Sequence, residues 1–226
     1  MGEKNIAFLA RHGAKHSIPP QSVPYGANIV AFEKLGIKRI ISTNAVGSLK
    51  PDFKPSEFVF FDQYVNMTNG RADTFFDKNM VAHIGSAEPY CNELRRVDIK
   101  TAKGLGIKHH ENGTIVVMGV LRSSTKAESR FFSRQGFDPI GMTQYQEMAL
   151  AREKGICYIR IDLVTDYDVG LKGVKGIKPV SADEVGNVFS ANIESVKKFI
   201  LKVAPEIPDK QSCECSMALD GAVLSH

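Results

Sequence analysis

The chain has 226 residues, which predicts one large domain or two small ones. Its 29 basic and 25 acidic side chains give a formal charge of +4, too small to indicate a nucleic-acid-binding protein. No apolar run approaches the roughly 20 residues of a membrane span, and the first residues lack the apolar core of a signal peptide. We therefore expect a cytoplasmic globular protein with no nucleic-acid partner and no membrane partner.

Short apolar segments alternate along the chain with helical segments that end in glycine. The pattern predicts strands at residues 6–9, 37–41, 58–62, 114–118, 139–142 and 156–161, and helices at residues 25–35, 88–103, 126–135 and 145–154. Gly36, Gly106 and Gly155 each separate a helix from the next strand, and glycine adopts the left-handed conformation of a helix end at little cost. Helix, glycine and strand in this order are typical of an α/β fold with a mostly parallel sheet.

A last helix is predicted at residues 185–203, where apolar side chains recur on one face. Pro205 and Pro208 follow it, so residues from about 205 to 226 are interpreted as a C-terminal tail. No linker or internal repeat divides the chain. We expect residues 1–226 to form a single α/β domain with a mixed, mostly parallel sheet flanked by helices.

Arg11, His12, Gly13 and His16 follow directly on the predicted strand at residues 6–9. Ligands of open α/β sheets bind at the carboxyl ends of the strands. Arginine offers a donor fork that suits phosphate, and glycine lets the backbone approach a ligand closely. The cluster favours an anion site, and a solvated basic turn is the alternative interpretation.

Asp166 and Asp168 follow the predicted strand at residues 156–161 in an extended segment. Side chains at i and i+2 of such a segment share a face. Two neighbouring carboxylates push one pKa up, so one acid can donate a proton to a ring nitrogen while the other accepts from an amine. The glycine- and lysine-rich residues 170–178 predict a mobile loop placed to cover this site. A pair of turn and cap residues is the alternative interpretation.

Two further patterns are weaker signals. Met142 and Thr143 end a predicted strand, with Glu147 on the next helix, and a strand-end threonine commonly has a structural role. Residues 43–49 form a small-residue segment, interpreted as a loop whose N–H groups can bind an anion or make a simple turn.

The four cysteines give no metal motif in the sequence. Cys91 and Cys157 are interpreted as buried packing residues, because free cysteine is among the most buried residue types. Cys213 and Cys215 are too close together for a zinc-ribbon pair, so they have a redox or stabilising role or none. No cluster has metal-ligand spacing, and we expect no metal.

Taken together, these motifs resemble the methylthioadenosine phosphorylases, members of the trimeric branch of the purine nucleoside phosphorylases. The resemblance extends from about residue 6 to the C-terminal tail, with the motifs in matching order and spacing. It is carried by Arg11-His12-Gly13 with His16, Asn28, residues 43–49, Ala87-Glu88-Pro89-Tyr90-Cys91, Lys126-Ala127-Glu128-Ser129, Gly141-Met142-Thr143 and Thr165-Asp166-Tyr167-Asp168.

The resemblance implies that the chain cleaves a purine nucleoside with phosphate to give a free base and a sugar 1-phosphate. Phosphate is then a co-substrate, with no cofactor, and the implied assembly is a homotrimer or hexamer. The phosphate-binding residues implied are Arg11, His12, Asn44, Ala45 and Thr143. The substrate-binding residues implied are Met142, Ser123, Ser124, Thr165 and His83, the last of them acting across a subunit interface.

Asp166 and Asp168 take the catalytic role in this resemblance, Asp166 nearest the N7 edge of the purine and Asp168 at its 6-amino group. Glycosidic cleavage makes an oxocarbenium-like sugar and an electron-rich base. An acid at N7 stabilises the departing base, and a bound phosphate stabilises the sugar cation. A carboxylate accepts from a 6-amino group, whereas relatives that use 6-oxopurines carry asparagine at the base-reading position.

The chain departs from the family pattern in several places. The glycine-rich phosphate loop expected near the N-terminus has no counterpart, and the position of a base-stacking aromatic holds Ser123. Asn44 and Gln146 replace a threonine and a proline. A catalytically impaired homologue that binds nucleoside or acts as an assembly subunit is therefore the alternative function, and a hydrolase that uses water is a third.

Overall fold

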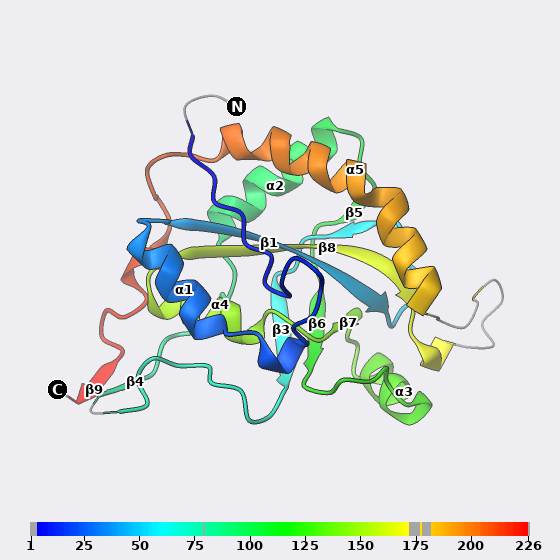
Figure 1. Cartoon of the computed structure of the whole chain (residues 1–226), viewed down its shortest axis with the longest axis horizontal. Helices are drawn as coiled ribbons and strands as arrows, with labels where there is room; N and C mark the ends of the chain where they lie inside the picture. The colour runs from blue at the N-terminus through cyan, green and yellow to red at the C-terminus, as the bar shows by residue number, and fades with distance from the viewer. Residues whose placement is uncertain (1–3, 79, 172–176, 178–181, 226) are drawn as a thin grey trace.

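The computed structural model describes residues 4–78, 80–171, 177 and 182–225 (Figure 1). The helices are α1 (Tyr25–Lys34), α2 (Asn92–Gly104), α3 (Lys126–Arg134), α4 (Tyr145–Glu153) and α5 (Ala182–Glu206). The strands are β1 (Arg39–Ser48), β2 (Phe58–Val59), β3 (Gln63–Met67), β4 (Val81–Ala82), β5 (His109–His110), β6 (Thr114–Met118), β7 (Pro139–Gly141), β8 (Cys157–Tyr167) and β9 (Val223–Ser225). These elements confirm the predicted α/β class.

The main sheet has the strand order β3-β6-β7-β1-β8-β2-β5. The pairs β1–β7 and β2–β8 are antiparallel, and the other four pairs are parallel, as the mixed, mostly parallel prediction requires. β1 and β8 are paired from Arg39 with Cys157 to Ser48 with Tyr167, and the register shifts between Val46 and Gly47. This long parallel pair is the centre of the sheet.

β8 is buried on both faces because helices cover both sides of the sheet. Its first nine residues are all buried, a pattern typical of a central strand of a parallel sheet. α5 and α2 lie above β1 and β8 in Figure 1, and α1 and α4 lie below them. Phe199 of α5 packs against Phe58 and Phe60, with ring centroids 5.9 and 5.8 Å apart. Burial of these aromatic rings fixes α5 on its face of the sheet.

Two of the predicted elements are wrong. Residues 6–9 form no strand, and Phe8 is 78% exposed. A segment becomes a strand only when a neighbouring backbone pairs with it, and in the described part of the chain residues 6–9 have no such neighbour. Residues 43–48 are part of β1 and not a loop, because they pair with β8.

The predicted C-terminal tail is folded onto the body of the protein. Residues Glu214–Met217 form a 3-10 turn, and β9 pairs with β4 in a second, two-stranded sheet. Most of the predicted basic loop at residues 170–178 lies outside the described residues. Among the described helices, none is long and apolar enough to cross a membrane.

Asp98 of α2 provides a test of burial in the core. Its side chain is fully buried, and neither carboxylate oxygen has a partner among the described residues. Burial raises the pKa of Asp98 well above its ordinary value. The native state therefore keeps this proton to a higher pH than the unfolded state, so the free energy of unfolding falls as pH rises from about 4 through the raised pKa.

We expect Asp98→Leu to remove this fall and to increase the free energy of unfolding at pH 7 by roughly 1–3 kcal/mol, the cost of a buried unpaired polar group. Urea unfolding between pH 4 and pH 8 measures both effects. Asp220→Leu, at an exposed position, is the control. Equal pH dependence in wild type and Asp98→Leu would contradict the assignment.

Candidate active site

Polar side chains from four segments of the chain meet along the second half of β1. Thr43 to Gly47 lie on β1 between β7 and β8. The carboxyl end of β7 leads into Thr143, and the carboxyl end of β8 carries Thr165 and Asp166. Gly47 is paired with Asp166 after the register shift. β1 therefore carries two clusters of polar residues. We call the cluster around Asn44 the anion group, because its side chains can bind an anion, and the cluster around Gly47 the carboxylate group.

Arg11 is bound by β1 and α4. Its Nη1 donates to Glu147 Oε2 at 2.6 Å, and its Nη2 donates to Thr43 O at 2.7 Å and to Asn44 Oδ1 at 3.0 Å. Burial is the largest single effect and works against the charge, but Glu147 together with Tyr158 and Tyr25 outweighs it, so the pKa of Arg11 lies above its ordinary value. These bonds use three of the five guanidinium N–H donors, and Tyr158 also lies close to the guanidinium, so at most two donors remain for an anion.

Asn44 connects Arg11 to the core of the protein. Its Oδ1 also accepts from Thr143 Oγ1 at 3.0 Å, and its Nδ2 donates to Asp162 Oδ1 at 3.0 Å. Arg11, Asn44 and Thr143, which sequence reasoning assigned to one anion site, therefore lie in contact. Ala45 is the next residue on β1 and is exposed.

A fully buried ion pair lies beneath Asn44. Arg160 Nε donates to Asp162 Oδ1 at 2.8 Å, Arg160 Nη2 donates to Asp162 Oδ2, and the guanidinium lies 5.2 Å from the Phe61 ring centroid. Burial raises the pKa of Asp162, and the Arg160 charge only partly offsets this effect. The two-bond pair fixes the Asp162 carboxylate and hence the Asn44 side chain that donates to it.

Gln144 holds the turn that presents Thr143. It is fully buried with φ of 97°, a conformation that costs of order 1–3 kcal/mol for a residue other than glycine. Its side chain accepts from Arg160 Nη1 and donates to Tyr90 OH. These two bonds in the core hold the strained backbone, and the Thr143 hydroxyl is thereby directed at Asn44.

Glu147 is the main site residue to which sequence reasoning gave no role. Its Oε2 accepts from Arg11, from Ser42 Oγ at 3.2 Å and from Tyr158 OH at 2.6 Å. Burial, with the Glu147 charge, raises the pKa of Tyr158 well above its ordinary value, so the phenol remains a donor. Arg11 and Glu147 are 136 residues apart, and no local pattern connects them.

His12 lies beside the anion group and is neutral at pH 7. Burial lowers the pKa of His12, and the Arg11 charge lowers it further, although the bond to Ile18 opposes both. Its Nδ1 lies 2.8 Å from Ile18 O, so this nitrogen carries the proton and Nε2 is the acceptor atom. The His12 ring stacks on His16 at 4.7 Å between centroids.

Asp166 lies at the second polar group of β1. Thr165 Oγ1 is 2.8 Å from Asp166 Oδ1 and 3.2 Å from Val46 O. A Cβ built on Gly47 would lie 3.1 Å from Asp166 Oδ2, so only glycine leaves the carboxylate its full room. Gly47 therefore sets the position of Asp166.

Asp168 follows β8 and is buried. Its backbone N–H donates to Ser48 O at 2.8 Å, which binds it to the end of β1. Its Oδ2 has no hydrogen-bond partner within the described chain. A buried carboxylate oxygen without a donor is costly, so a ligand N–H at this point would be strongly favoured.

The remaining predicted site residues lie at different distances from these two groups. Met142 precedes Thr143, and its carbonyl accepts from Arg71 at 2.8 Å. Ser123 is exposed and Ser124 half-buried, and both follow β6, which is separated from β1 by β7. His83 follows β4, and its N–H donates to Ala222 O in the region of β9. Figure 1 shows β4 and β9 at the far side of the molecule from the end of β8.

A cavity of about 850 Å³ opens beside the anion group. Arg11, Thr43 and Glu147 line one end of it, and it continues between residues 4–9, the first half of β1 and α5. Asp166 and Asp168 are not among its lining residues. The cavity therefore gives access to the Arg11 end of the site and not to the aspartates.

Comparison with known proteins identifies the class to which this fold and site belong. The sequence model of the phosphorylase superfamily matches residues 2–205. Because this match covers most of the chain, the chain belongs to the phosphorylase superfamily.

Individual relatives narrow the class. The chain is 47% identical over 221 residues to the S-methyl-5'-thioadenosine phosphorylase of Thermofilum pendens, covering 98% of this chain and 82% of that protein. It is 42% identical over 229 residues to the 6-oxopurine nucleoside phosphorylase of Pyrococcus furiosus, covering 98% and 85%. The crystal structure of a methylthioadenosine phosphorylase from an antarctic soil metagenomic library superposes with a TM-score of 0.89 at 35% identity, covering 96% and 76%. The phosphorylase resemblance is confirmed.

Because the Glu147 carboxylate accepts three hydrogen bonds, a conservative substitution at this position should lower the free energy of unfolding. We expect Glu147→Gln to lower the free energy of unfolding by roughly 1.5–3 kcal/mol, because hydrogen bonds to a buried charged group are lost. Urea denaturation at pH 7 measures this value. Glu194→Gln, which removes a carboxylate at an exposed helical ion pair, should leave the urea midpoint unchanged. Equal effects of the two substitutions would contradict the buried network.

Proposed function

We propose that this protein catalyses the phosphorolysis of 5'-methylthioadenosine or a related 6-aminopurine nucleoside, giving free base and sugar 1-phosphate. One observation carries the proposal: β1 holds an anion group at Asn44 and a carboxylate group at Gly47. Three residues of strand correspond to roughly 10 Å, the scale of a nucleoside and its attacking phosphate. The names of the relatives support this function over a non-catalytic homologue.

At the anion end, Arg11 would donate to phosphate, and His12 Nε2 would accept from a phosphate hydroxyl. The Thr143 hydroxyl, which donates to Asn44 Oδ1 in the free protein, would turn its one proton to the phosphate. Arg11 keeps its charge at every physiological pH. Asn44 would act mainly by holding these donors in position. A phosphate bound here stabilises the oxocarbenium-like sugar and is placed to attack it. Ala45 and Met142 would line the path between this end and the base.

At the base end, Asp166 would share a proton with N7 and so stabilise the departing purine. The unpaired Oδ2 of Asp168 would accept from the 6-amino group. A 6-oxopurine offers an acceptor at the same position and would leave this oxygen unsatisfied. The acceptor character of Asp168 therefore favours 6-aminopurines over the substrates named for the 6-oxopurine relative.

The placement of the other predicted contacts fits an oligomer. His83 lies far from Asp166 within one chain, as expected for a residue that serves a neighbouring subunit's site. Ser123 and Ser124 would contact substrate from the end of β6. A trimer or hexamer in the cytoplasm, with no catalytic metal and no cofactor, is the proposed working form.

Adenine release from methylthioadenosine, with and without phosphate, tests the function. We expect release that requires phosphate and yields a sugar 1-phosphate, and slower turnover of inosine than of adenosine. Adenine release at the same rate with and without phosphate would indicate a hydrolase. Binding of nucleoside without any turnover would support the impaired homologue and contradict the proposal.

Gly47→Ala tests the carboxylate end separately from folding. The added Cβ must displace Asp166 Oδ2 by a few tenths of an ångström. We expect kcat/KM for methylthioadenosine to fall about tenfold, since small misplacements of catalytic groups are costly. Gly186→Ala, where the new methyl group meets no described atom within 4 Å beyond its chain neighbours and the nearby backbone of its own helix, should keep full activity. Full activity of Gly47→Ala would argue against the role of Asp166.

A further inference from the structure

Arg71 lies at the carboxyl ends of two neighbouring strands and has no role in the proposed mechanism. Its Nη1 donates to Met142 O at 2.8 Å, and its Nη2 makes a longer bond to Met118 O at 3.5 Å. Met118 is the last residue of β6, and Met142 directly follows β7. One guanidinium therefore joins the ends of β6 and β7.

The two carbonyls lie just beyond the last residue pair between β6 and β7. Val117 pairs with Gly141 in the parallel ladder, so Met118 and Met142 come next in register. A planar guanidinium offers its donors in a fixed fork, and it can therefore hold two carbonyls at one spacing. Arg71 thus fixes the spacing of the two strand ends beyond the ladder.

The segment before Arg71 is packed closely on the end of β6. A Cβ built on Gly119 would lie 3.0 Å from Thr68 Cα and 3.2 Å from Asn69 N, so a larger residue would force the segment away. Gln146 of α4 is fully buried, and its Oε1 accepts from Arg71 Nη1 at 3.3 Å. Its Nε2 donates to Thr68 Oγ1 at 2.7 Å. The segment is therefore held against both β6 and α4.

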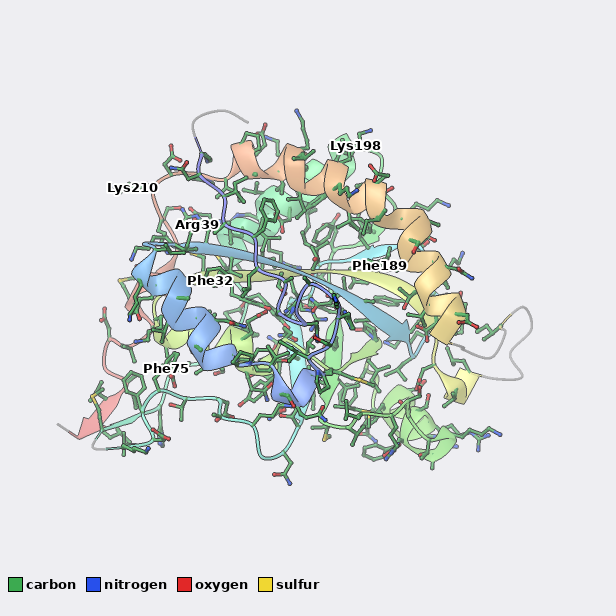
Figure 2. All side chains as sticks on the ribbon, in the orientation of Figure 1. Phe32, Arg39, Phe75, Phe189, Lys198 and Lys210 are labelled. Carbon is green, nitrogen blue, oxygen red and sulfur yellow. The ribbon has the colours of Figure 1, made fainter. Side chains whose placement is uncertain are left out.

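The segment after Arg71 is anchored to the last residue of α4. Thr74 Oγ1 donates to Glu153 Oε1 at 2.6 Å, and Phe75 N donates to Glu153 Oε2 at 2.7 Å. Phe75 also packs against the core, and Figure 2 shows it on the side of β1 and β8 where α1 lies. Arg71 thus extends from a segment that is fixed on both sides.

The charge of Arg71 has no carboxylate partner in the described part of the chain. Its acceptors are two backbone carbonyls and one amide oxygen, whereas Arg11 is bonded to the Glu147 carboxylate. Burial lowers the pKa of Arg71. Its Nε is buried and has no acceptor among the described residues, which costs free energy. Arg71 therefore stabilises the fold less than a paired arginine would, and stability alone does not explain its position.

Both strand ends that Arg71 joins carry predicted substrate contacts. Met142 is one of these contacts, and its carbonyl is the nearer acceptor of Arg71. Ser124 is another, and its Oγ lies 3.9 Å from Met118 Sδ, within reach of a hydrogen bond to sulfur. Arg71 therefore bonds to the backbone of one substrate contact and to the residue that holds the other.

We propose that Arg71 is a positioning residue, which sets the spacing of Met142 and Ser124 and thereby the affinity for the nucleoside. The inference rests on the proposed function, because it takes Met142 and Ser124 as substrate contacts. Phosphate affinity depends much less on Arg71, since Arg11 is held separately by β1 and α4. The signature of this role is a loss of nucleoside affinity without an equal loss of phosphate affinity.

Arg71→Met removes the bonds to both carbonyls and keeps a long apolar side chain. We expect Kd for methylthioadenosine, measured by calorimetry without phosphate, to rise about tenfold, since small misplacements of binding groups are costly. Kd for phosphate should change less than about threefold, because separate bonds hold the anion group. Amide hydrogen exchange should become faster in peptides that contain Met118 or Met142, and stay unchanged in peptides from the second half of β1.

Arg95→Met is the matched control. Arg95 is also half-buried, and its guanidinium bonds to Glu111 O and approaches Phe60 O, in the residues that directly follow β5 and β2. None of the predicted site residues follows these two strands, so we expect wild-type affinity for both ligands. Arg71→Lys keeps the charge but lacks the fork, and it should lose nucleoside affinity to a smaller extent.

Equal losses of nucleoside and phosphate affinity in Arg71→Met would overturn the proposal, as would nucleoside affinity equal to that of wild type. Unchanged hydrogen exchange at both strand ends would also overturn it. If Arg71→Met does not fold, the same comparison with Arg71→Lys decides. Wild type that binds methylthioadenosine but releases no adenine would contradict the proposed function alone, because none of these measurements needs turnover.

Discussion

The buried ion pair of Arg160 and Asp162 is the interaction on which the candidate active site depends. Two charges in the core cost free energy unless they are paired and fully hydrogen-bonded. Here they are held by two mutual bonds, and the remaining groups bond to Asn44 and Gln144. Asn44 in turn holds Arg11, so a core interaction fixes the position of the largely buried Arg11 charge.

The same arrangement explains how one strand serves two kinds of chemistry. Near Asn44, β1 is surrounded by donors that suit an anion, and Arg11 is oriented there by Glu147. Near Gly47, the register shift and the missing side chain make room for the Asp166 carboxylate. The Arg11 guanidinium and the Asp166 carboxylate are thus positioned by different residues of the same strand.

Local sequence was enough to predict most of the fold and part of the site. Glycine-terminated helices and buried apolar runs located α1, α4 and β6, and motif resemblance brought Arg11, Asn44 and Thr143 together. Local sequence could not predict interactions between residues that are far apart in the chain. Residues 6–9 lack a strand partner, and Glu147 contacts Arg11 only in the folded chain. The sulfur atoms of all four cysteines also lie within 4.8 Å of one another, which the sequence did not predict, since spacing along the chain says nothing about convergence in space.

Phosphate binding measured by calorimetry tests most directly whether Asn44 organises the anion end. We expect wild type to bind phosphate and Asn44→Ala to bind it roughly tenfold or more weakly, because hydrogen bonds to charged groups are worth about 1.5–3 kcal/mol. Asn192→Ala on α5 removes a side chain that bonds to Ser56 Oγ and Val188 O, and it should match wild type. Equal phosphate affinity of Asn44→Ala and wild type, with both folded by circular dichroism, would contradict the account.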